Sequence, residues 1–368
     1  MTPRIGFALS AAAALLATCV VPSGAPACCP APPSGKPVVN ADQSVIMIWD
    51  ATAKTQHFIR QASFQSDADD FGFLVPTPTQ PALDEAGNEA FPFLHKLTEP
   101  ETKLLHRPSG GMGCGCSRVS TKSAAPAAEV VKVLEEKLVA GLHAVVLQAD
   151  SADALVDWLK ERGYAYSPRI KAWAKPYVQA GWKITALKVA KDELGDDRQE
   201  NKKVTAAALR LTFKTDRPIF PYREPDSKSA AEALGVKQRL LRIYFLADAR
   251  YQGNLTKEVP WTGQVAWSGK LDVEDRQKAI ELLKLPESTG PAEWWLTEFE
   301  DNWPYEVAPA DVVFSRDPNQ ATVKRPPIIQ YISAAEPVEA MAYALAAVVA
   351  LPPLVRRVCR ARNGARTK

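Results

Sequence analysis

The run of residues 141–214 constrains the fold most, because it holds three strand candidates and one amphipathic helix in close succession. In order, the elements are a strand over Gly141 to Gln148, a helix with Leu155, Trp158 and Leu159, and strands over Trp182 to Ala190 and Val204 to Phe213. The last two strands are rich in β-branched and aromatic residues and flank a charged stretch, Lys191 to Lys203. Strand patterns on both sides of a solvated turn predict a hairpin, here packed beside the helix.

Short strand candidates also fill the rest of the chain. They cover Ser44 to Trp49, Thr55 to Phe64, Phe71 to Val75, Arg239 to Ala247 and Val312 to Phe314, with helix candidates at Ala128 to Val139 and Val273 to Leu285 and an aromatic run at Glu293 to Trp303. The first two strands form a predicted hairpin, and Pro76 is expected to end the third, because proline cannot donate to a ladder. Hairpins and helices in mixed order predict an α+β fold with mostly antiparallel strands and a few packed helices.

Residues 1–27 have the features of an export signal. Arg4 supplies a positive charge, Ile5 to Val21 is apolar, and Ala25-Pro26-Ala27 places small residues before a cleavage site at Cys28. One alternative is a lipoprotein signal ending at Cys19, although Thr18 is larger than the residue such a site prefers. A second alternative, an uncleaved anchor, is disfavoured by the short, alanine-rich apolar run. We therefore expect the body of the protein to be exported.

A second apolar segment, residues 338–355, lies near the C-terminus and is followed by a basic tail, residues 356–368. About twenty apolar residues span a bilayer core, so the length of this segment is marginal, and Pro352-Pro353 weakens its last turn. A basic cluster after an apolar helix is typical of a stop-transfer anchor whose tail stays in the cytoplasm. The alternative is that residues 338–355 form a buried C-terminal helix of the folded body. The prediction is a single transmembrane helix that anchors an extracytoplasmic body at the membrane.

Composition changes divide the exported body into two predicted lobes. A stretch rich in Ser, Ala and Lys, Ser117 to Pro126, separates an N-terminal lobe, 28–122, from a C-terminal α+β lobe, 128–316. A proline-rich and polar tether, 317–337, leads to the predicted anchor.

Charge is spread unevenly over the chain. The leader and tail hold 7 of the 45 basic residues and none of the 42 acidic residues. The remainder of the chain is therefore acidic, which argues against a nucleic-acid partner.

Four cysteines of the exported body carry the most evident chemistry: Cys28, Cys29, Cys114 and Cys116. An even number of thiols in an oxidising compartment predicts disulfides. A disulfide between cysteines that are neighbours in sequence would close a strained ring. Cys28 and Cys29 are therefore expected to pair with Cys114 and Cys116. Such bridges would stabilise the fold by about 3 to 4 kcal/mol in the chain-entropy model.

The alternative is that these four cysteines bind a soft metal or exchange disulfides. Two close thiol pairs suit copper or zinc, with His57, His95 or His106 as further ligands. However, neither Cys28-Cys29 nor Cys114-Gly115-Cys116 has the spacing of a zinc knuckle or of a thioredoxin-like redox motif. Structural disulfides without a cofactor remain the first prediction.

Other candidate sites are weaker. Acidic clusters at Asp67, Asp69 and Asp70 and at Asp192 to Glu200 lack the glycine and distal glutamate of a calcium loop, so they are interpreted as solvated turns. His143 in an apolar strand is interpreted as a core residue. Five C-terminal tryptophans suit either a sugar-binding platform or the core, and the core is favoured: Trp261, Trp267, Trp294, Trp295 and Trp303.

A search for catalytic motifs finds none that identifies an enzyme class. The chain has no nucleophile elbow, no zinc-protease helix motif and no phosphate-binding glycine loop. Ser109-Gly110-Gly111 lies in a loop close to His106 in the sequence. Closeness in sequence is weak evidence that Ser109 and His106 form a catalytic pair. No catalytic residue is therefore assigned, and a non-enzymatic role is favoured.

An ordered set of segments resembles the bacterial domain-of-unknown-function 2330 family. The segments are Cys28-Cys29, Asn40-Ala41-Asp42-Gln43-Ser44, Asp69 to Pro78, Cys114-Gly115-Cys116, Leu155 to Leu159, Gly163-Tyr164, Tyr177, Gly181-Trp182, Leu211-Thr212-Phe213 and Pro218-Ile219-Phe220-Pro221. The resemblance spans residues 28–314. It implies an exported protein, often with a C-terminal membrane helix, and it implies no activity.

Two functional hypotheses follow. The first is a membrane-anchored extracytoplasmic interaction or structural module of the bacterial cell envelope, which presents a disulfide-linked body to an envelope protein. The second is a thiol-dependent redox or soft-metal-handling protein that uses Cys28, Cys29, Cys114 and Cys116. Thiol titration with metal analysis distinguishes them.

Overall fold

The computed structural model describes residues 29–31, 38–66, 68, 71–107, 131–164, 168–189 and 203–333. The chain divides into two compact units. The larger contains Met1–Thr98 and Ser117–Lys324, and the smaller contains Glu99–Cys116 and Arg325–Lys368. Each unit is described here by itself.

A seven-stranded sheet forms the centre of the larger unit, in the order β17-β18-β15-β3-β4-β13-β7. Its strands are β17 (Gln264–Lys270), β18 (Trp295–Asn302), β15 (Leu240–Ala247), β3 (Gln43–Asp50), β4 (Thr55–Gln61), β13 (Leu209–Lys214) and β7 (Ala82–Glu85). All neighbouring strands are antiparallel except β15 and β3, which run parallel. Strands from both predicted lobes therefore take part in this sheet.

A five-stranded antiparallel sheet packs on one face of the first, in the order β1-β6-β11-β10-β9. Its strands are β1 (Cys29–Ala31), β6 (Phe71–Thr77), β11 (Lys183–Val189), β10 (Leu142–Gln148) and β9 (Lys132–Val139). Met47 and Leu211 of the larger sheet share one buried cluster with Phe73, Val146 and Leu187 of the smaller sheet. This apolar cluster is the main core, because it joins the inner faces of both sheets.

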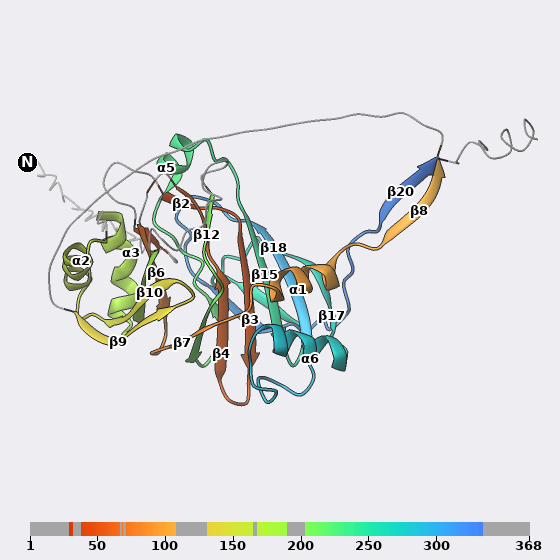
Figure 1. Cartoon of the computed structure of the whole chain (residues 1–368), viewed down its shortest axis with the longest axis horizontal. Helices are drawn as coiled ribbons and strands as arrows, with labels where there is room; N and C mark the ends of the chain where they lie inside the picture. The colour runs from red at the N-terminus through yellow and green to blue at the C-terminus, as the bar shows by residue number, and fades with distance from the viewer. Residues whose placement is uncertain are drawn as a thin grey trace, which may run out of the picture. The chain divides into compact units, whose positions relative to one another are not determined.

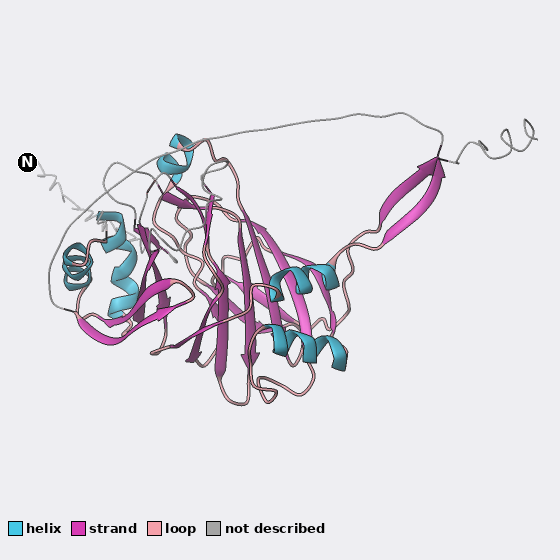
Figure 2. Cartoon of the chain, viewed as in Figure 1, coloured by secondary structure: helices cyan, strands magenta, loops and turns pink. Residues whose placement is uncertain are grey.

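Helices cover the outer face of each sheet, so the larger unit has four layers, α/β/β/α (Figures 1 and 2). The helices are α1 (Ala90–Thr98) and α6 (Val273–Leu282) over the seven-stranded sheet, and α2 (Ala152–Glu161) and α3 (Pro168–Gln179) over the five-stranded sheet. Side chains that alternate along each strand enter different clusters. On β10, for example, Val146 faces the other sheet, whereas Val145 and Leu147 face α2 and α3.

Local sequence signals define the ends of several helices. The Ser151 hydroxyl accepts a hydrogen bond from the Ala154 amide at the start of α2, and the Asp272 carboxylate accepts one from the Asp275 amide at the start of α6. Gly181 follows α3 with φ of 72°, which lets the Trp182 amide donate back to the Tyr177 carbonyl.

Two small three-stranded sheets and a short helix complete the larger unit. Their orders are β12-β5-β2 and β14-β19-β16. The elements are β2 (Val38–Asn40), β5 (Ser63–Ser66), β12 (Lys203–Thr205), β14 (Ile219–Phe220), β16 (Tyr251–Asn254), β19 (Val312–Arg316) and α5 (Lys228–Ala233). In the smaller unit, β8 (Thr102–Arg107) and β20 (Ile328–Ser333) pair in parallel.

The mixed, mostly antiparallel α+β fold is confirmed, but one predicted hairpin is wrong. The segments predicted to pair belong to different sheets: β11 pairs with β10 and β6, whereas β13 pairs with β4 and β7. Each segment finds a buried place between two partners from elsewhere in the chain, which covers more apolar surface than an isolated hairpin would.

The helix predicted over Ala128 to Val139 is also wrong, since residues 132–139 form strand β9. Ala140 and Gly141 have φ of 53° and 70° and join β9 to β10 in a two-residue hairpin loop. Pairing with the apolar β10 therefore overrides the helical spacing of the β9 residues.

Most other predicted elements are confirmed. The hairpin of β3 and β4, helices α2 and α6, and strands β6, β15 and β19 lie where the sequence predicts them, and the aromatic run at Glu293 to Trp303 contains strand β18. However, β6 continues through Pro76 to Thr77. This is possible because β1 pairs only with residues 72–74, so no donor is required on that side at Pro76.

None of the helices in the described residues is long and apolar enough to cross a bilayer. The predicted signal peptide, 1–27, the transmembrane segment, 338–355, and the tail, 356–368, lie outside the described residues.

Candidate functional site

The predicted cysteine site is described only at Cys29. This residue lies on β1 opposite Leu74 of β6 and has 0% exposed surface. Its Sγ lies 3.4 Å from the Pro30 carbonyl oxygen, to which it donates. Cys28, Cys114 and Cys116 lie outside the described residues, so the disulfides stay a prediction.

The histidines proposed as further metal ligands lie on separate elements. His57 is on β4, where its Nδ1 lies 2.9 Å from the Thr212 hydroxyl, and His95 is on α1. Burial, with a smaller contribution from the Arg210 charge, lowers the pKa of His57 to about 4. His106 belongs to β8 in the smaller unit. Within the described residues, no three His, Cys, Asp or Glu side chains are grouped as metal ligands.

The other singled-out residues have plainer roles. Trp261, Trp294 and Trp303 are buried, as predicted, while Trp267 and Trp295 are half-buried. His143 is exposed, so its interpretation as a core residue is wrong. It lies opposite Leu138, which is 61% exposed, at an end of the sheet that solvent reaches. Both predicted acidic turns, at Asp67 to Asp70 and Asp192 to Glu200, include residues outside the described part.

A buried polar network connects the segment around Asn40 to the C-terminal half of the chain. Arg239, with 0% exposed side chain, lies 2.7 Å from a carboxylate oxygen of Glu224. The Asn40 amide donates to the other oxygen of Glu224, and Arg60 donates to both Asn40 and Gln43. Burial raises the pKa of Glu224, and the Arg239 charge opposes this shift. These groups bind one another rather than a cavity, which indicates a structural role.

A second buried network is built on Asp311. Its carboxylate accepts hydrogen bonds from the Tyr177 hydroxyl at 2.9 Å and from the Tyr222 and Arg223 amides, and it forms an ion pair with Arg223. Burial raises the pKa of Asp311 and also raises the pKa of Tyr177 well above its usual value. The network fixes the end of α3 against the loop that precedes α5.

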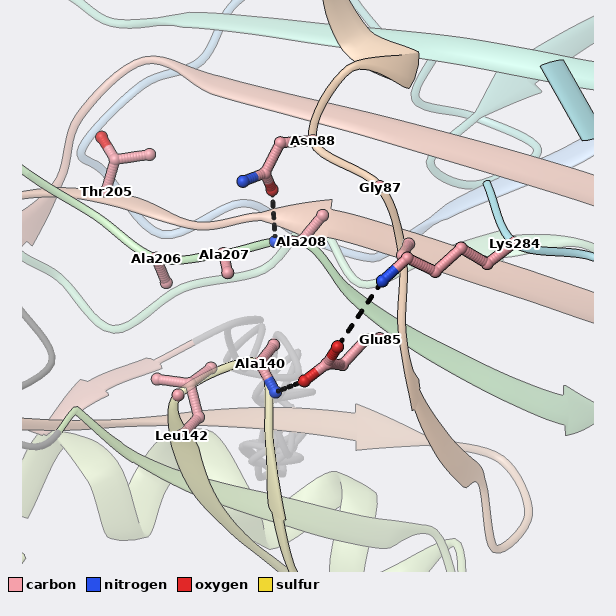
Figure 3. Close-up of a pocket in the computed structure, with 12 residues that line it drawn as sticks. Glu85, Gly87, Asn88, Ala140, Leu142, Thr205, Ala206, Ala207, Ala208 and Lys284 are labelled. Atoms are coloured by element: carbon pink, nitrogen blue, oxygen red, sulfur yellow. Dashed lines mark hydrogen bonds and ion pairs between the residues drawn. The ribbon is translucent and has the colours of Figure 1, made fainter. Parts of the chain in front are cut away.

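One cavity is lined mainly by small residues from four separate segments (Figure 3). It has a volume of about 380 Å³, and we call it the alanine-lined cavity. Its lining residues are Glu85, Ala86, Gly87, Asn88, Ala140, Gly141, Leu142, Thr205, Ala206, Ala207, Ala208 and Lys284. They come from the β7–α1 loop, the β9–β10 turn, the β12–β13 connection and the residues after α6.

Polar side chains hold these segments together around the cavity. The two Glu85 carboxylate oxygens reach the Ala140 amide at 3.2 Å and the Lys284 ammonium at 3.6 Å (Figure 3). The Asn88 side-chain oxygen accepts a hydrogen bond from the Ala208 amide at 2.8 Å, and the Ala86 amide donates to the Ala208 carbonyl. The cavity wall is thus tied to the ends of both large sheets.

Close backbone packing also shapes the cavity. A Cβ atom at Gly87 would lie 2.0 Å from the Leu282 carbonyl oxygen, so only glycine fits there. Ala207 is exposed, and within the described residues neither its amide nor its carbonyl has a hydrogen-bond partner. The cavity therefore presents unpaired backbone groups between short side chains.

Sequence reasoning missed this cavity. Its polar residues, Glu85, Asn88 and Lys284, belong to three segments with no recognisable motif. The only sequence signal was the run Thr205 to Ala208, where three successive alanines leave the backbone accessible.

Comparisons with known proteins give one match. The model of a family described as "Uncharacterized protein conserved in bacteria (DUF2330)" matches residues 22–315. No curated protein and no solved structure matches the chain.

Proposed function

Because the chain belongs to the DUF2330 family of uncharacterised bacterial proteins, which assigns no activity, we propose a function from the site itself. The protein is a non-enzymatic interaction module of the cell envelope, and its alanine-lined cavity binds an extended backbone segment of a partner protein. The unpaired backbone of Ala207 within this cavity is the observation that carries the proposal.

An extended peptide suits this cavity better than a compact, highly charged ligand. Extended peptides bind by pairing their main-chain N–H and C=O groups with unpaired backbone groups, while small pockets select their side chains. The alanine and glycine lining allows another backbone to approach closely, and the amide and carbonyl of Ala207 supply a donor and an acceptor.

The charged pair at the cavity gives a means of selecting a peptide. The Glu85 and Lys284 side chains are 56% and 60% exposed, so their mutual attraction is strongly screened and contributes little to stability. A charged peptide side chain can replace one partner at small cost. The Asn88 oxygen is already used by Ala208, which keeps that wall in place while Glu85 and Lys284 exchange partners.

The first test uses the full-length protein, purified in detergent, and a displayed library of short linear peptides. Selected peptides should lose binding when Ala207 is replaced by Arg, because the longer side chain fills the cavity. They should also lose binding when their own backbone amides are N-methylated. Ala172→Arg on the exposed face of α3 is the matched control and should bind normally. Selected peptides that bind the Ala207→Arg variant as well as the wild type would refute the proposal.

The proposal includes membrane anchoring, which is supported by the sequence of the chain ends. The leader, 1–27, directs the body out of the cytoplasm, and residues 338–355 with the basic tail hold it at the membrane. Protease added outside spheroplasts should degrade the body and spare a tag fused after Lys368. A body that is protected while the tag is degraded would contradict this topology.

A further inference from the structure

Two neighbouring hollows on the larger unit share Arg217 and Val313, and we propose that together they bind a carboxylate-bearing saccharide. The first, the Trp182 hollow, has a volume of about 280 Å³ and is lined by Pro78, Thr79, Trp182, Lys214, Thr215, Asp216, Arg217, Ile219 and Val313. The second, the Asn254 hollow, has a volume of about 530 Å³ and is lined by Arg217, Asn254, Leu255, Thr256, Lys257, Val313, Phe314 and Ser315. Nothing in the proposed peptide-binding role uses these residues.

The Trp182 hollow has an aromatic and apolar wall. Trp182 is half-buried, and Pro78, Ile219 and Val313 lie around the same hollow. An indole combines a large flat apolar surface with a polar N–H group, and such a surface stacks on the apolar face of a sugar ring while the N–H group reaches its hydroxyls. The wall therefore suits a pyranose ring better than it suits a small inorganic anion.

Trp182 is held in place before any ligand arrives. Its ring lies 5.2 Å from that of Tyr177, and its amide donates to the Tyr177 carbonyl across Gly181. The Tyr177 hydroxyl is in turn fixed by the buried Asp311 carboxylate, which is paired with Arg223. A side chain fixed in this way loses little conformational entropy on binding, which favours affinity.

Arg217 is the cation at the centre of the site. Asp216 is already paired with Lys54 at 2.7 Å, and the Lys214 ammonium donates to the Ala53 carbonyl and the Thr55 hydroxyl. In contrast, Arg217 is exposed and forms no ion pair with any other described residue. A guanidinium binds a carboxylate through two parallel hydrogen bonds, so Arg217 is suited to the acid group of the ligand.

The Asn254 hollow extends the site with a second cation and neutral polar groups. Lys257 is exposed and, like Arg217, has no ion-pair partner in the described part of the chain. Asn254 and Ser315 can bind sugar hydroxyls, whereas the Thr256 hydroxyl is already bound to Glu258. Because Arg217 borders both hollows, an acid group bound to it would lie where the two hollows meet.

Two sources supply this chemistry outside the cytoplasm: uronic-acid polysaccharides, and the lactyl carboxylate of muramic acid in peptidoglycan. The test is calorimetry on the full-length protein in detergent at low salt. The ligands are tetragalacturonate and a muramic-acid-containing glycan fragment, with chitotetraose as the neutral control and tetraglutamate as the acidic peptide control. At least one carboxylated sugar should bind, and the one that binds identifies the source.

Arg217→Gln should weaken the binding of that sugar about tenfold, the usual effect of losing one charge-assisted contact, and Trp182→Leu should weaken it by a similar factor. Lys278→Gln, which removes a positive charge on α6, should bind as the wild type does. Arg217 is exposed, so its variant keeps the test valid if Trp182→Leu fails to fold. Ala207→Arg should leave sugar binding intact, which separates this inference from the peptide proposal.

The inference is overturned if neither carboxylated sugar binds, or if chitotetraose binds as tightly as they do. It is also overturned if tetraglutamate binds as tightly as the better sugar, which would assign the site to acidic peptides. Unchanged sugar binding in Arg217→Gln would exclude Arg217 as the acid-binding group and overturn the proposed site.

Discussion

His57 shows how burial changes the chemistry of a single residue. His57 lies on β4, its Nδ1 is 2.9 Å from the Thr212 hydroxyl, and the positive charge of Arg210 acts on its ring. Burial is the main reason that its pKa falls to about 4. The ring is thus neutral in the folded protein above about pH 4, whereas in the unfolded chain it takes up a proton near pH 6.5.

The pKa of His57 predicts acid sensitivity. Because the folded pKa lies below that of the unfolded chain, the unfolded state binds more protons between pH 6.5 and about 4. Stability from this residue is present above pH 6.5 and is lost as the pH falls through that window, by up to about 3 kcal/mol. Urea unfolding of the wild type and of His57→Gln at several pH values measures the difference.

The His57→Gln variant should lose less stability than the wild type as the pH falls from 6.5 to 4. His143→Gln, at an exposed histidine, is the matched control and should follow the wild type. Equal losses in wild type and His57→Gln would show that His57 titrates normally in the folded protein.

Among the elements, the β9–β10 hairpin shows a conflict between local preference and pairing. Ala140 has φ of 53°, a conformation that costs a residue with a Cβ atom roughly 1 to 2 kcal/mol relative to ordinary backbone. The pairing of eight-residue β9 with the buried β10 outweighs this cost. The strained turn also supplies the Ala140 amide that binds Glu85 at the alanine-lined cavity.

Two reciprocal substitutions test this interpretation. Ala140→Gly should stabilise the protein by about 0.5 to 1 kcal/mol, because relief of the turn exceeds the entropy cost of glycine. Gly181→Ala should destabilise it by about 1 kcal/mol. At Gly181 φ is 72° and an added Cβ would meet no atom within 4 Å, so the effect there is purely conformational. Chemical denaturation measures both, and changes of the same sign would contradict the interpretation.

For the whole molecule, the oxidation state of the cysteines decides between the two functional hypotheses. Cys29 is fully buried in the layer between β6 and the outer helices, where a thiol is inaccessible to exchange partners from solvent. This position favours a structural role for Cys29.

Thiol titration of the full-length protein from membranes should find one free thiol per chain in denaturant, that of Cys359. Two disulfides should account for Cys28, Cys29, Cys114 and Cys116, so the count should rise to five after reduction. Reduction should also lower the unfolding free energy by about 3 to 4 kcal/mol. Five free thiols together with bound copper or zinc would instead establish the metal-handling hypothesis.

Sequence alone determined the type and position of most elements, because their signals are local. The signals are the alternation of apolar and polar residues along β3, β4 and β15, the apolar face of α2 and the turn residues between elements. Each of these signals spans only about ten residues of sequence. The sequence also predicted that the C-terminal tryptophans lie in the core, which is confirmed for Trp261, Trp294 and Trp303, whereas Trp267 and Trp295 are half-buried. Burial of a large aromatic side chain removes a large apolar area from water, so burial in the core is strongly favoured over exposure to solvent.

Only the tertiary structure decided which strands pair and which residues meet at a cavity. Residues 183–189 and 209–214 read equally well as a hairpin and as members of two sheets, since both arrangements satisfy the same alternation. The two arrangements differ in how much apolar surface each strand buries against segments distant in sequence, and the sequence of one segment does not contain that information. For the same reason Glu85, Ala207 and Lys284, distant in sequence, became neighbours only when the layers α/β/β/α closed around a shared core.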